Sequence, residues 1–338
     1  MAIQMSNDQI AALGPDRDTV SRTAWVAWVV IALSAWAAVV ASSGRGDEIL
    51  AQWPVAVAML LGSYFAGSTP LGGGVVGFPV LVLGFDFDAS VGRDFSFAIQ
   101  AVGMTSASIW ILTARYPVAW RWLRPALIGA AISTPLGCMV LAPVLSDLGS
   151  KLTFAVLVGA YGLVQLSQRK ELTEARARTD SAEGSDWKVG VPLGLMGGAL
   201  SVACGSGSDV VIYIALMLYL GVELRCALYT SVILMAWTSI LGILTQLSLG
   251  EVGVPVTDAW LAAAPVVLFG APLGALVSAK IPRAFTLNLV TLLCLGQVIW
   301  FCLHEGLSLT AQLGVWLAVF VGFAVLLGGR RLQRRSRS

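Results

Sequence analysis

Eight long apolar segments dominate this 338-residue sequence and limit what it can fold into. Most of them hold about 20 residues, the number that an α-helix needs to cross a hydrocarbon core of about 30 Å. Because that core contains no water, each backbone amide must be bonded within the protein, which favours helices. The segments are residues 23–42, 95–114, 125–145, 152–167, 226–248, 259–279, 284–303 and 307–328.

The composition agrees with an integral membrane protein and argues against several other classes. The chain is 57% hydrophobic and only 12% charged, whereas soluble domains are about a quarter charged. One histidine and five cysteines without a CxxC pair predict neither a metal site nor a cofactor. The sequence has no HExxH or GxSxG motif and no GxxxxGK[ST] motif for binding ATP. We therefore expect no enzyme, no ATPase subunit and no nucleic-acid partner.

Two further apolar regions, residues 54–84 and 189–221, are too long for one helix and are interrupted by glycine. The interruptions are Gly72-Gly73-Gly74 and Gly205-Ser206-Gly207. Pieces of about 14–16 residues reach only about 21–24 Å, which is short of the bilayer core. Each region is therefore predicted to be a re-entrant hairpin of two short helices. Two full crossings in each region would give the same sidedness and stay an alternative.

Basic residues predict which loops face the cytoplasm. The tail after residue 328 carries five arginines, and loop 115–124 carries three arginines and no acid. These parts and the polar stretch 168–188 are predicted to be cytoplasmic. Loops 85–94 and 249–258 are mostly acidic and are predicted to be outside. Both termini are then cytoplasmic, and the two interrupted regions open to opposite sides of a bacterial inner membrane.

The second half of the chain repeats short strings of the first half at offsets of about 132 to 137 positions. The two glycine interruptions match, and Arg93 matches Arg225. Thr105-Ser106-Ala107 matches Trp237-Thr238-Ser239, and a Pro-Leu-Gly string also occurs twice. Each unit holds one hairpin and three crossings, and an odd number of crossings inverts the second unit.

The predicted fold is an all-α integral membrane protein with two inverted-topology repeats. Each repeat is a re-entrant broken helical hairpin plus three transmembrane helices, with one flanking helix at each end of the chain. The expected divisions are 1–50 (cytoplasmic N-terminus and flanking helix), 51–167 (first repeat), 168–188 (cytoplasmic linker), 189–303 (second repeat) and 304–338 (last helix and basic tail).

The tips of the two hairpins are the predicted ligand site. The first amides of a helix lack intrahelical partners and carry a positive partial charge, so two such ends near the midplane would bind an anion. No lysine or arginine is predicted to lie well inside a segment, which leaves amides and hydroxyls as the anion ligands. The predicted substrate-binding residues are Ser68, Thr69, Gly72, Gly73, Gly74, Gly205, Ser206, Gly207, Ser208, Thr105, Ser106, Trp237 and Thr238.

Asp209 and Gln100 are the candidates for proton coupling. An intramembrane carboxylate is a functional candidate, but an acid in the first turn of a helix also stabilises that helix. Gln100 has packing between helices as its alternative role. The tip serines have helix capping as an alternative, and the mid-helix Ser and Thr residues have bonds to their own i−4 carbonyls.

The sequence resembles the TauE/SafE sulfite exporter family, also called the toluene sulfonate uptake permeases. The resemblance rests on GSTPLGGGVVGFPVL (67–81), its second copy GALSVACGSGSDVVIY (198–213) and the duplicated units, and it covers about 54–303. It implies a secondary transporter, an exporter, of sulfite or small organosulfonates such as C2 sulfonates. The residues alone indicate a small anion, so a passive anion channel or a carrier of another oxyanion or carboxylate stays open. Small-residue faces also leave a homodimer in the bilayer open.

Overall fold

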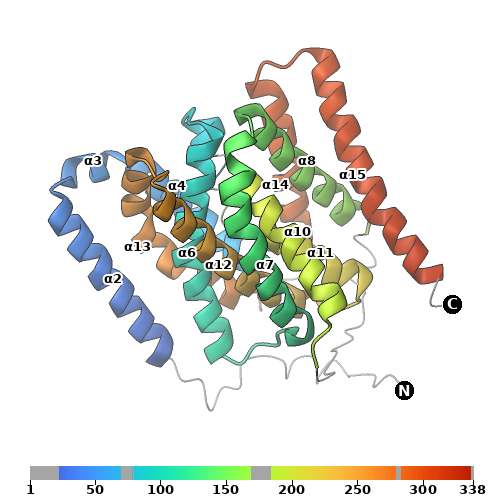
Figure 1. The fold of residues 1–338 in the computed structure, drawn as a ribbon, viewed down its shortest axis with the longest axis horizontal. Coiled ribbons are helices and arrows are strands. Elements are labelled where there is room, and N and C mark those ends of the chain that lie inside the picture. The colour runs from blue at the N-terminus through green and yellow to red at the C-terminus, as the bar shows by residue number, and fades with distance from the viewer. Residues whose placement is uncertain (1–22, 70–77, 79, 169–183, 279–282, 336–338) are drawn as a thin grey trace.

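The structure is a computed structural model that describes residues 23–69, 78, 80–168, 184–278 and 283–335, and these residues form a bundle of helices (Figure 1). Each of the eight predicted segments corresponds to a helix, although several helices begin earlier than predicted and the segment 125–145 extends past the end of its helix. With α10, described below, they give nine helices in the described chain that are long and apolar enough to cross a membrane. The eight are α2 (Thr23–Ser43), α6 (Ala89–Thr113), α7 (Trp120–Val140), α8 (Asp147–Ser167), α12 (Leu224–Leu249), α13 (Val254–Ser278), α14 (Arg283–His304) and α15 (Leu309–Arg335).

The second interruption lies where the sequence predicts it. Helix α10 (Trp187–Cys204) ends there, and after Gly205–Gly207 the chain continues as α11 (Ser208–Ile214) and the π-helix η3 (Ala215–Tyr219). The predicted length of the first piece is wrong, because α10 has 18 residues. Helical bonding extends back to Trp187, inside the stretch predicted to be linker, so α10 counts among the candidate spans and α11 does not.

The first interrupted region begins with α4 (Trp53–Ser68), and Thr69 after it has extended backbone. The next described helical segment is the π-helix η1 (Val80–Gly84). The predicted tip residues Gly72, Gly73 and Gly74 lie outside the described residues. Two short elements were not predicted: α3 (Gly46–Ala51) before α4, and the 3₁₀ turn η2 (Ala142–Val144) after α7.

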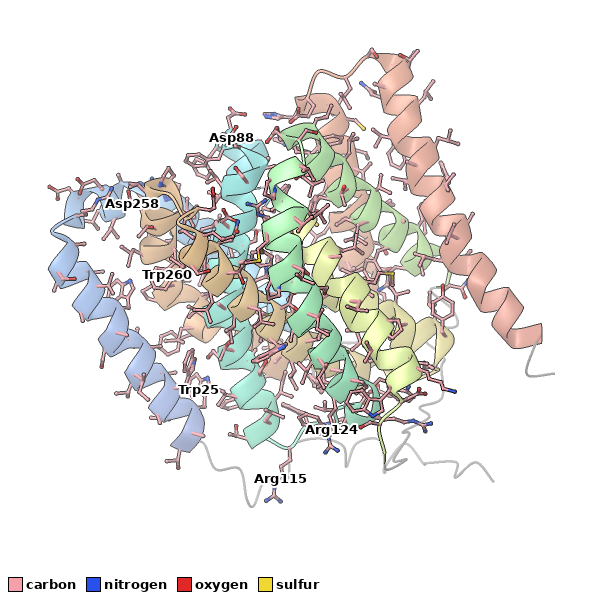
Figure 2. All side chains as sticks on the ribbon, in the orientation of Figure 1. Trp25, Asp88, Arg115, Arg124, Asp258 and Trp260 are labelled. Carbon is pink, nitrogen blue, oxygen red and sulfur yellow. The ribbon has the colours of Figure 1, made fainter. Side chains whose placement is uncertain are left out.

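Polar loops gather at two opposite ends of the bundle, which Figure 2 marks with Asp88 and Asp258 at the top and Arg115 and Arg124 at the bottom. At the Asp88 end, an ion pair of 2.7 Å between Arg45 and Asp258 ties α3 to the start of α13. Helix α4 follows α3 directly, and α6 begins just after Asp88. The first interrupted region therefore begins and ends at the Asp88 end.

The second interrupted region begins and ends at the opposite end. Before α10, the Asp186 amide donates to the Arg121 carbonyl at 2.9 Å. In the second turn of α12, the Thr230 hydroxyl accepts from the Ala119 amide at 2.9 Å. Arg121 and Ala119 belong to the same stretch, where α7 begins. The two ends of residues 187–222 therefore lie together at the Arg115 end.

The first helix of each interrupted region packs on a helix of the other half of the chain, α4 along α13 and α10 along α7. Both contacts need glycine. A Cβ atom at Gly67 would lie 1.9 Å from the Ala271 carbonyl oxygen, and one at Gly194 would lie 2.0 Å from the Ala126 carbonyl oxygen. Helices α6 and α12 pack on each other in the centre, while α2 and α15 flank the bundle (Figure 1).

Candidate anion site

The tip between α10 and α11 is buried and can only be built from glycine. Gly205 has φ +72° and Gly207 has φ +153°, backbone conformations that residues with a side chain rarely adopt. A Cβ atom at Gly205 would lie 2.5 Å from Ser96 Cβ and 2.9 Å from the Arg93 carbonyl oxygen. The tip is therefore pressed directly against the first turns of α6.

Protein acceptors already bind the first amides of α11. The Ser208 amide donates to Ser201 Oγ at 2.9 Å. The amides of Gly207 and Val210 donate to Asp209 Oδ1 at 3.2 and 2.9 Å. Asp209 thus caps its own helix, so an anion at this tip must replace the Asp209 carboxylate.

Buried polar groups remain at the tip beyond the bonds of the cap. Asp209 is fully buried, and its Oδ2 has no hydrogen-bond partner among the described residues. The Ser208 hydroxyl donates to Met235 Sδ at 3.0 Å, and Ser206 is also buried. Buried polar atoms are nearly always paired in proteins, so the unpaired carboxylate oxygen marks the tip as a functional candidate.

Gln100 connects this tip to the first half of the chain. Its Nε2 donates to the carbonyl oxygens of Gly205 at 2.8 Å and Ser96 at 3.0 Å. Gln100 and Ser63 also line a cavity of about 10 Å³ between α4, α6 and α13, which is at the lower limit for one water molecule. Its Oε1 has no partner in the described part of the chain. Gln100 therefore positions the tip and faces α4.

The four predicted mid-helix residues do not gather at this tip. The Ser106 hydroxyl donates to the Leu268 carbonyl at 2.7 Å and accepts from Trp25, so it joins three helices. The Thr238 hydroxyl bonds its own i−4 carbonyl at 2.9 Å. The Trp237 indole is 39% exposed and donates to α7. Thr105 Oγ1 is buried without a partner among the described residues.

At the first tip, Ser68 and Thr69 are buried at the end of α4. Both hydroxyls donate to the carbonyl oxygen of Phe65, at 3.4 and 2.8 Å. These bonds close the last turn of α4. The glycines that follow, Gly72, Gly73 and Gly74, lie outside the described residues.

A buried ion pair beside the second tip was missed by the sequence reasoning, which assigned Arg93 and Asp94 to an outer loop. Helix α6 begins at Ala89, and the two residues are only 6% and 3% exposed. Arg93 Nε donates to Asp94 Oδ1 at 2.8 Å and Nη2 to Oδ2 at 3.3 Å. Gln246 of α12 adds a third bond to Asp94 at 2.9 Å. The predicted bounds of the loop 85–94 are therefore wrong, because helix α6 already begins at Ala89 and places both residues in its second turn.

A cavity of about 420 Å³ with polar and apolar lining leads from the Asp88 end to Arg93. Arg93 and Gln246 line it from α6 and α12, and α7 and α8 complete its wall. Arg93 is the one basic residue among its described lining. The remaining lining residues that bear charge or a thiol are Asp88, Asp147, Glu251 and Cys138.

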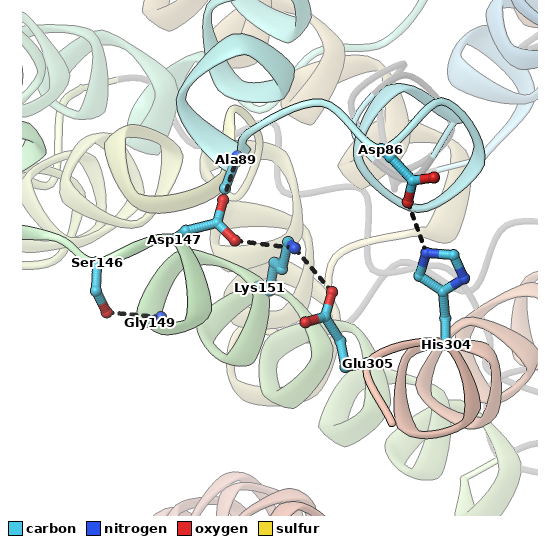
Figure 3. Close-up of polar contacts among 8 residues, drawn as sticks. All are labelled: Asp86, Ala89, Ser146, Asp147, Gly149, Lys151, His304 and Glu305. Atoms are coloured by element: carbon cyan, nitrogen blue, oxygen red, sulfur yellow. Dashed lines mark hydrogen bonds and ion pairs between the residues drawn. The ribbon is translucent and has the colours of Figure 1, made fainter. Parts of the chain in front are cut away.

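A network of ion pairs holds the rim of this cavity together (Figure 3). Lys151 of α8 contacts Asp147 at 2.9 Å and Glu305 at 2.7 Å. Asp147 also accepts from the Ala89 amide at the start of α6. These contacts join α6, α8 and the end of α14. In the described part of the chain, no three His, Cys, Asp or Glu side chains come together as a metal site requires.

The nine candidate spans, with polar and charged groups buried between them, make this a multi-pass integral membrane protein. A family model described as sulfite exporter TauE/SafE matches residues 54–301. The match covers well over half of the chain, and the chain belongs to this family of membrane transporters. Comparison with curated proteins and with solved structures gives no match.

Proposed function

We propose that this protein is a secondary transporter that exports sulfite or a small organosulfonate, such as a C2 sulfonate, across a bacterial inner membrane. The observation that carries the proposal is the second tip. A glycine break there buries the unpaired Asp209 Oδ2 and the hydroxyls of Ser206 and Ser208, in a chain that belongs to the sulfite exporter family. Such irregular backbone at membrane depth is typical of transporter ligand sites.

Alternating access requires two elements that open to opposite sides. We assign them to two inverted repeats, residues 51–167 and 189–303, with 168–188 as linker and 1–50 and 304–338 as flanks. The reciprocal packing of α4 on α13 and α10 on α7 supports this assignment. So does the position of the two interrupted regions, since each begins and ends at its own end of the bundle. The arginine-rich Arg115 end is assigned to the cytoplasm.

At the tip, the anion competes with the Asp209 carboxylate for the amides of Gly207 and Val210. A protonated Asp209 would release those amides more readily than a charged one, which makes Asp209 the coupling candidate at this position. Gln100 keeps the tip in place through its bond to Gly205. The first tip, with Ser68, Thr69 and Gly72–Gly74, is the proposed opposite wall of the site.

Flux through reconstituted liposomes tests this function. Labelled sulfite and labelled isethionate should enter or leave with saturable kinetics, and planar bilayers should show no single-channel currents. Channel currents would replace the carrier with a passive anion channel. Failure to bind or move sulfite and every C2 sulfonate would contradict the assigned substrate class.

Replacing Gly205 tests the position of the site. Gly205→Ala should reduce flux below about one-tenth, because the added methyl group meets Ser96 and Arg93 and moves the tip. Gly221→Ala is the matched control, since Gly221 has a similar φ of +70° but nothing within 4 Å of its Cβ position. Thermal unfolding of both variants separates lost transport from lost folding. Equal flux in the two variants would contradict a site at this tip.

A further inference from the structure

We propose that Arg93 binds the transported anion in the cavity at the Asp88 end, and that the anion takes the place of Asp94, which then binds a proton. The proposal rests on the proposed anion transport and deepens it, because it assigns an outer subsite and a coupling group that lie between the tip and the Asp88 end. It is carried by the buried ion pair and by the cavity that reaches it.

Arg93 has donors to spare on the side of the cavity. A guanidinium carries five N–H groups, and the bonds to Asp94 use one on Nε and one on Nη2. Nη1 has no acceptor among the described residues, and Arg93 lines the cavity of about 420 Å³. The space suits a small anion with several waters. A planar guanidinium binds a carboxylate or a sulfonate through the same pair of parallel bonds.

The subsite lies directly beside the tip. The Arg93 carbonyl oxygen would be 2.9 Å from a Cβ atom at Gly205, so the backbone of Arg93 and the tip touch. Ser96, one turn further along α6, also contacts Gly205. The outer subsite and the tip are therefore adjacent through the backbone of α6.

Charge balance at the buried pair links the anion to a proton. Arg93 and Asp94 together carry no net charge, so an arriving anion adds one negative charge in a region where uncompensated charge is costly. The anion takes over the guanidinium bonds, and a proton taken up from solution binds Asp94 Oδ2, the oxygen that Arg93 Nη2 releases. Gln246 Nε2 can still donate to Asp94 Oδ1. The subsite is then neutral again, with one proton taken up for each singly charged anion.

Among the described residues that line the cavity, the charged ones other than Arg93 are acidic. Asp88 just before α6 and Glu251 after α12 are exposed acids, and Asp147 on α8 is paired with Lys151. The α7 wall contributes the Cys138 thiol. Acidic residues at the mouth raise the local concentration of cations, protons included, and oppose anions. Anion binding in this cavity must therefore depend on Arg93, which is the one basic residue among the described residues that line it.

Calorimetry on the purified full-length chain measures both parts of the proposal. Isethionate is the probe, because its sulfonate stays singly charged near neutral pH whereas sulfite itself titrates there. Titrations in two buffers of different ionisation enthalpy give the protons taken up on binding. The wild type should take up about one proton per isethionate. Arg93→Gln should weaken binding by about 100-fold, and Asp94→Asn should bind isethionate with about one proton fewer than the wild type.

Controls separate this proposal from the proposed function. Arg45→Gln, which breaks the Arg45–Asp258 pair at the same end but outside the cavity lining, should leave binding unchanged. If Arg93→Gln does not fold, the double variant Arg93→Gln/Asp94→Asn removes both charges and gives the same binding test. Wild-type affinity without Arg93 overturns the subsite, and unchanged proton uptake in Asp94→Asn overturns the coupling. A wild type that neither binds nor transports any sulfonate overturns the proposed function instead.

Discussion

Helices α6 and α12 follow the two interrupted regions, pack on each other and are the most buried of the described candidate spans. The proposed repeat would make them equivalent and matches Arg93 with Arg225. They differ in where the helix begins. Helix α6 begins at Ala89, so Arg93 lies in its second turn and is buried, whereas α12 begins at Leu224 and leaves Arg225 half-buried in its first turn.

The two helices also begin with different caps. Glu223 accepts from the Arg225 and Cys226 amides, so α12 is capped by the residue just before it. Asp88, at the same place before α6, makes no such bond, and Asp147 of α8 accepts from Ala89 instead. About one turn of extra helix therefore moves an arginine from a helix boundary to a cavity wall. The match between Arg93 and Arg225 in the sequence therefore does not give the two arginines the same role.

The largest expected effect separates these two helices directly. Asp94→Leu should lower the free energy of unfolding by about 3–5 kcal/mol, because it leaves the Arg93 charge buried and unpaired. Glu223→Ala should cost only about 1 kcal/mol, the usual effect of losing a cap. Thermal and denaturant unfolding in detergent measure both changes.

A double variant serves as the control for Asp94→Leu. Arg93→Leu/Asp94→Leu removes both charges and should recover most of the stability that Asp94→Leu loses. Equal losses for Asp94→Leu and Glu223→Ala would mean that α6 and α12 are equivalent after all, and that the ion pair contributes no more than a helix cap.

Helices α4 and α10, unlike α6 and α12, are alike, because both pack closely on a neighbouring helix at a glycine. Gly67→Ala and Gly194→Ala should each cost about 1–3 kcal/mol, because the added methyl group meets a backbone carbonyl at about 2 Å in both. Gly314→Ala in α15, with nothing within 4 Å, should be neutral or slightly stabilising. A large loss at only one of the two packed glycines would show that the two half-bundles are not packed alike.

The helices and the second break could be predicted because each depends on local sequence. Apolar length specifies a spanning helix, and Gly205-Ser206-Gly207 specifies a break whatever surrounds it. The Arg93–Asp94 pair could not be found in this way, because a search for long apolar segments assigns charged residues to the loops between them. Their burial depends on Gln246, which is 152 positions away in the chain. The sequence leaves two roles open for Thr238 and for Asp209, and the structure shows that Thr238 bonds its own i−4 carbonyl and that Asp209 accepts from amides at the start of α11.

The smallest effect concerns the ion pairs at the two ends of the bundle. Lys151 is 13% exposed and bonds two carboxylates, so Lys151→Gln should cost about 1–2 kcal/mol. Arg121 is 36% exposed and 4.0 Å from Asp186, so Arg121→Gln should cost less than about 0.5 kcal/mol. The Lys151 change should also loosen the start of α6, because it frees the Asp147 carboxylate that accepts from Ala89.

Amide hydrogen exchange can measure how much Lys151→Gln loosens the start of α6. Amides at residues 89–92 should exchange faster in Lys151→Gln, while those at 224–227 should not change, because amides at the start of α12 donate to Glu223 and not to Asp147. Faster exchange at both helix starts would mean that Lys151 stabilises the whole bundle. No change at either would mean that Asp147 holds the start of α6 without Lys151, and the contrast between the two caps would then rest on Asp147 alone.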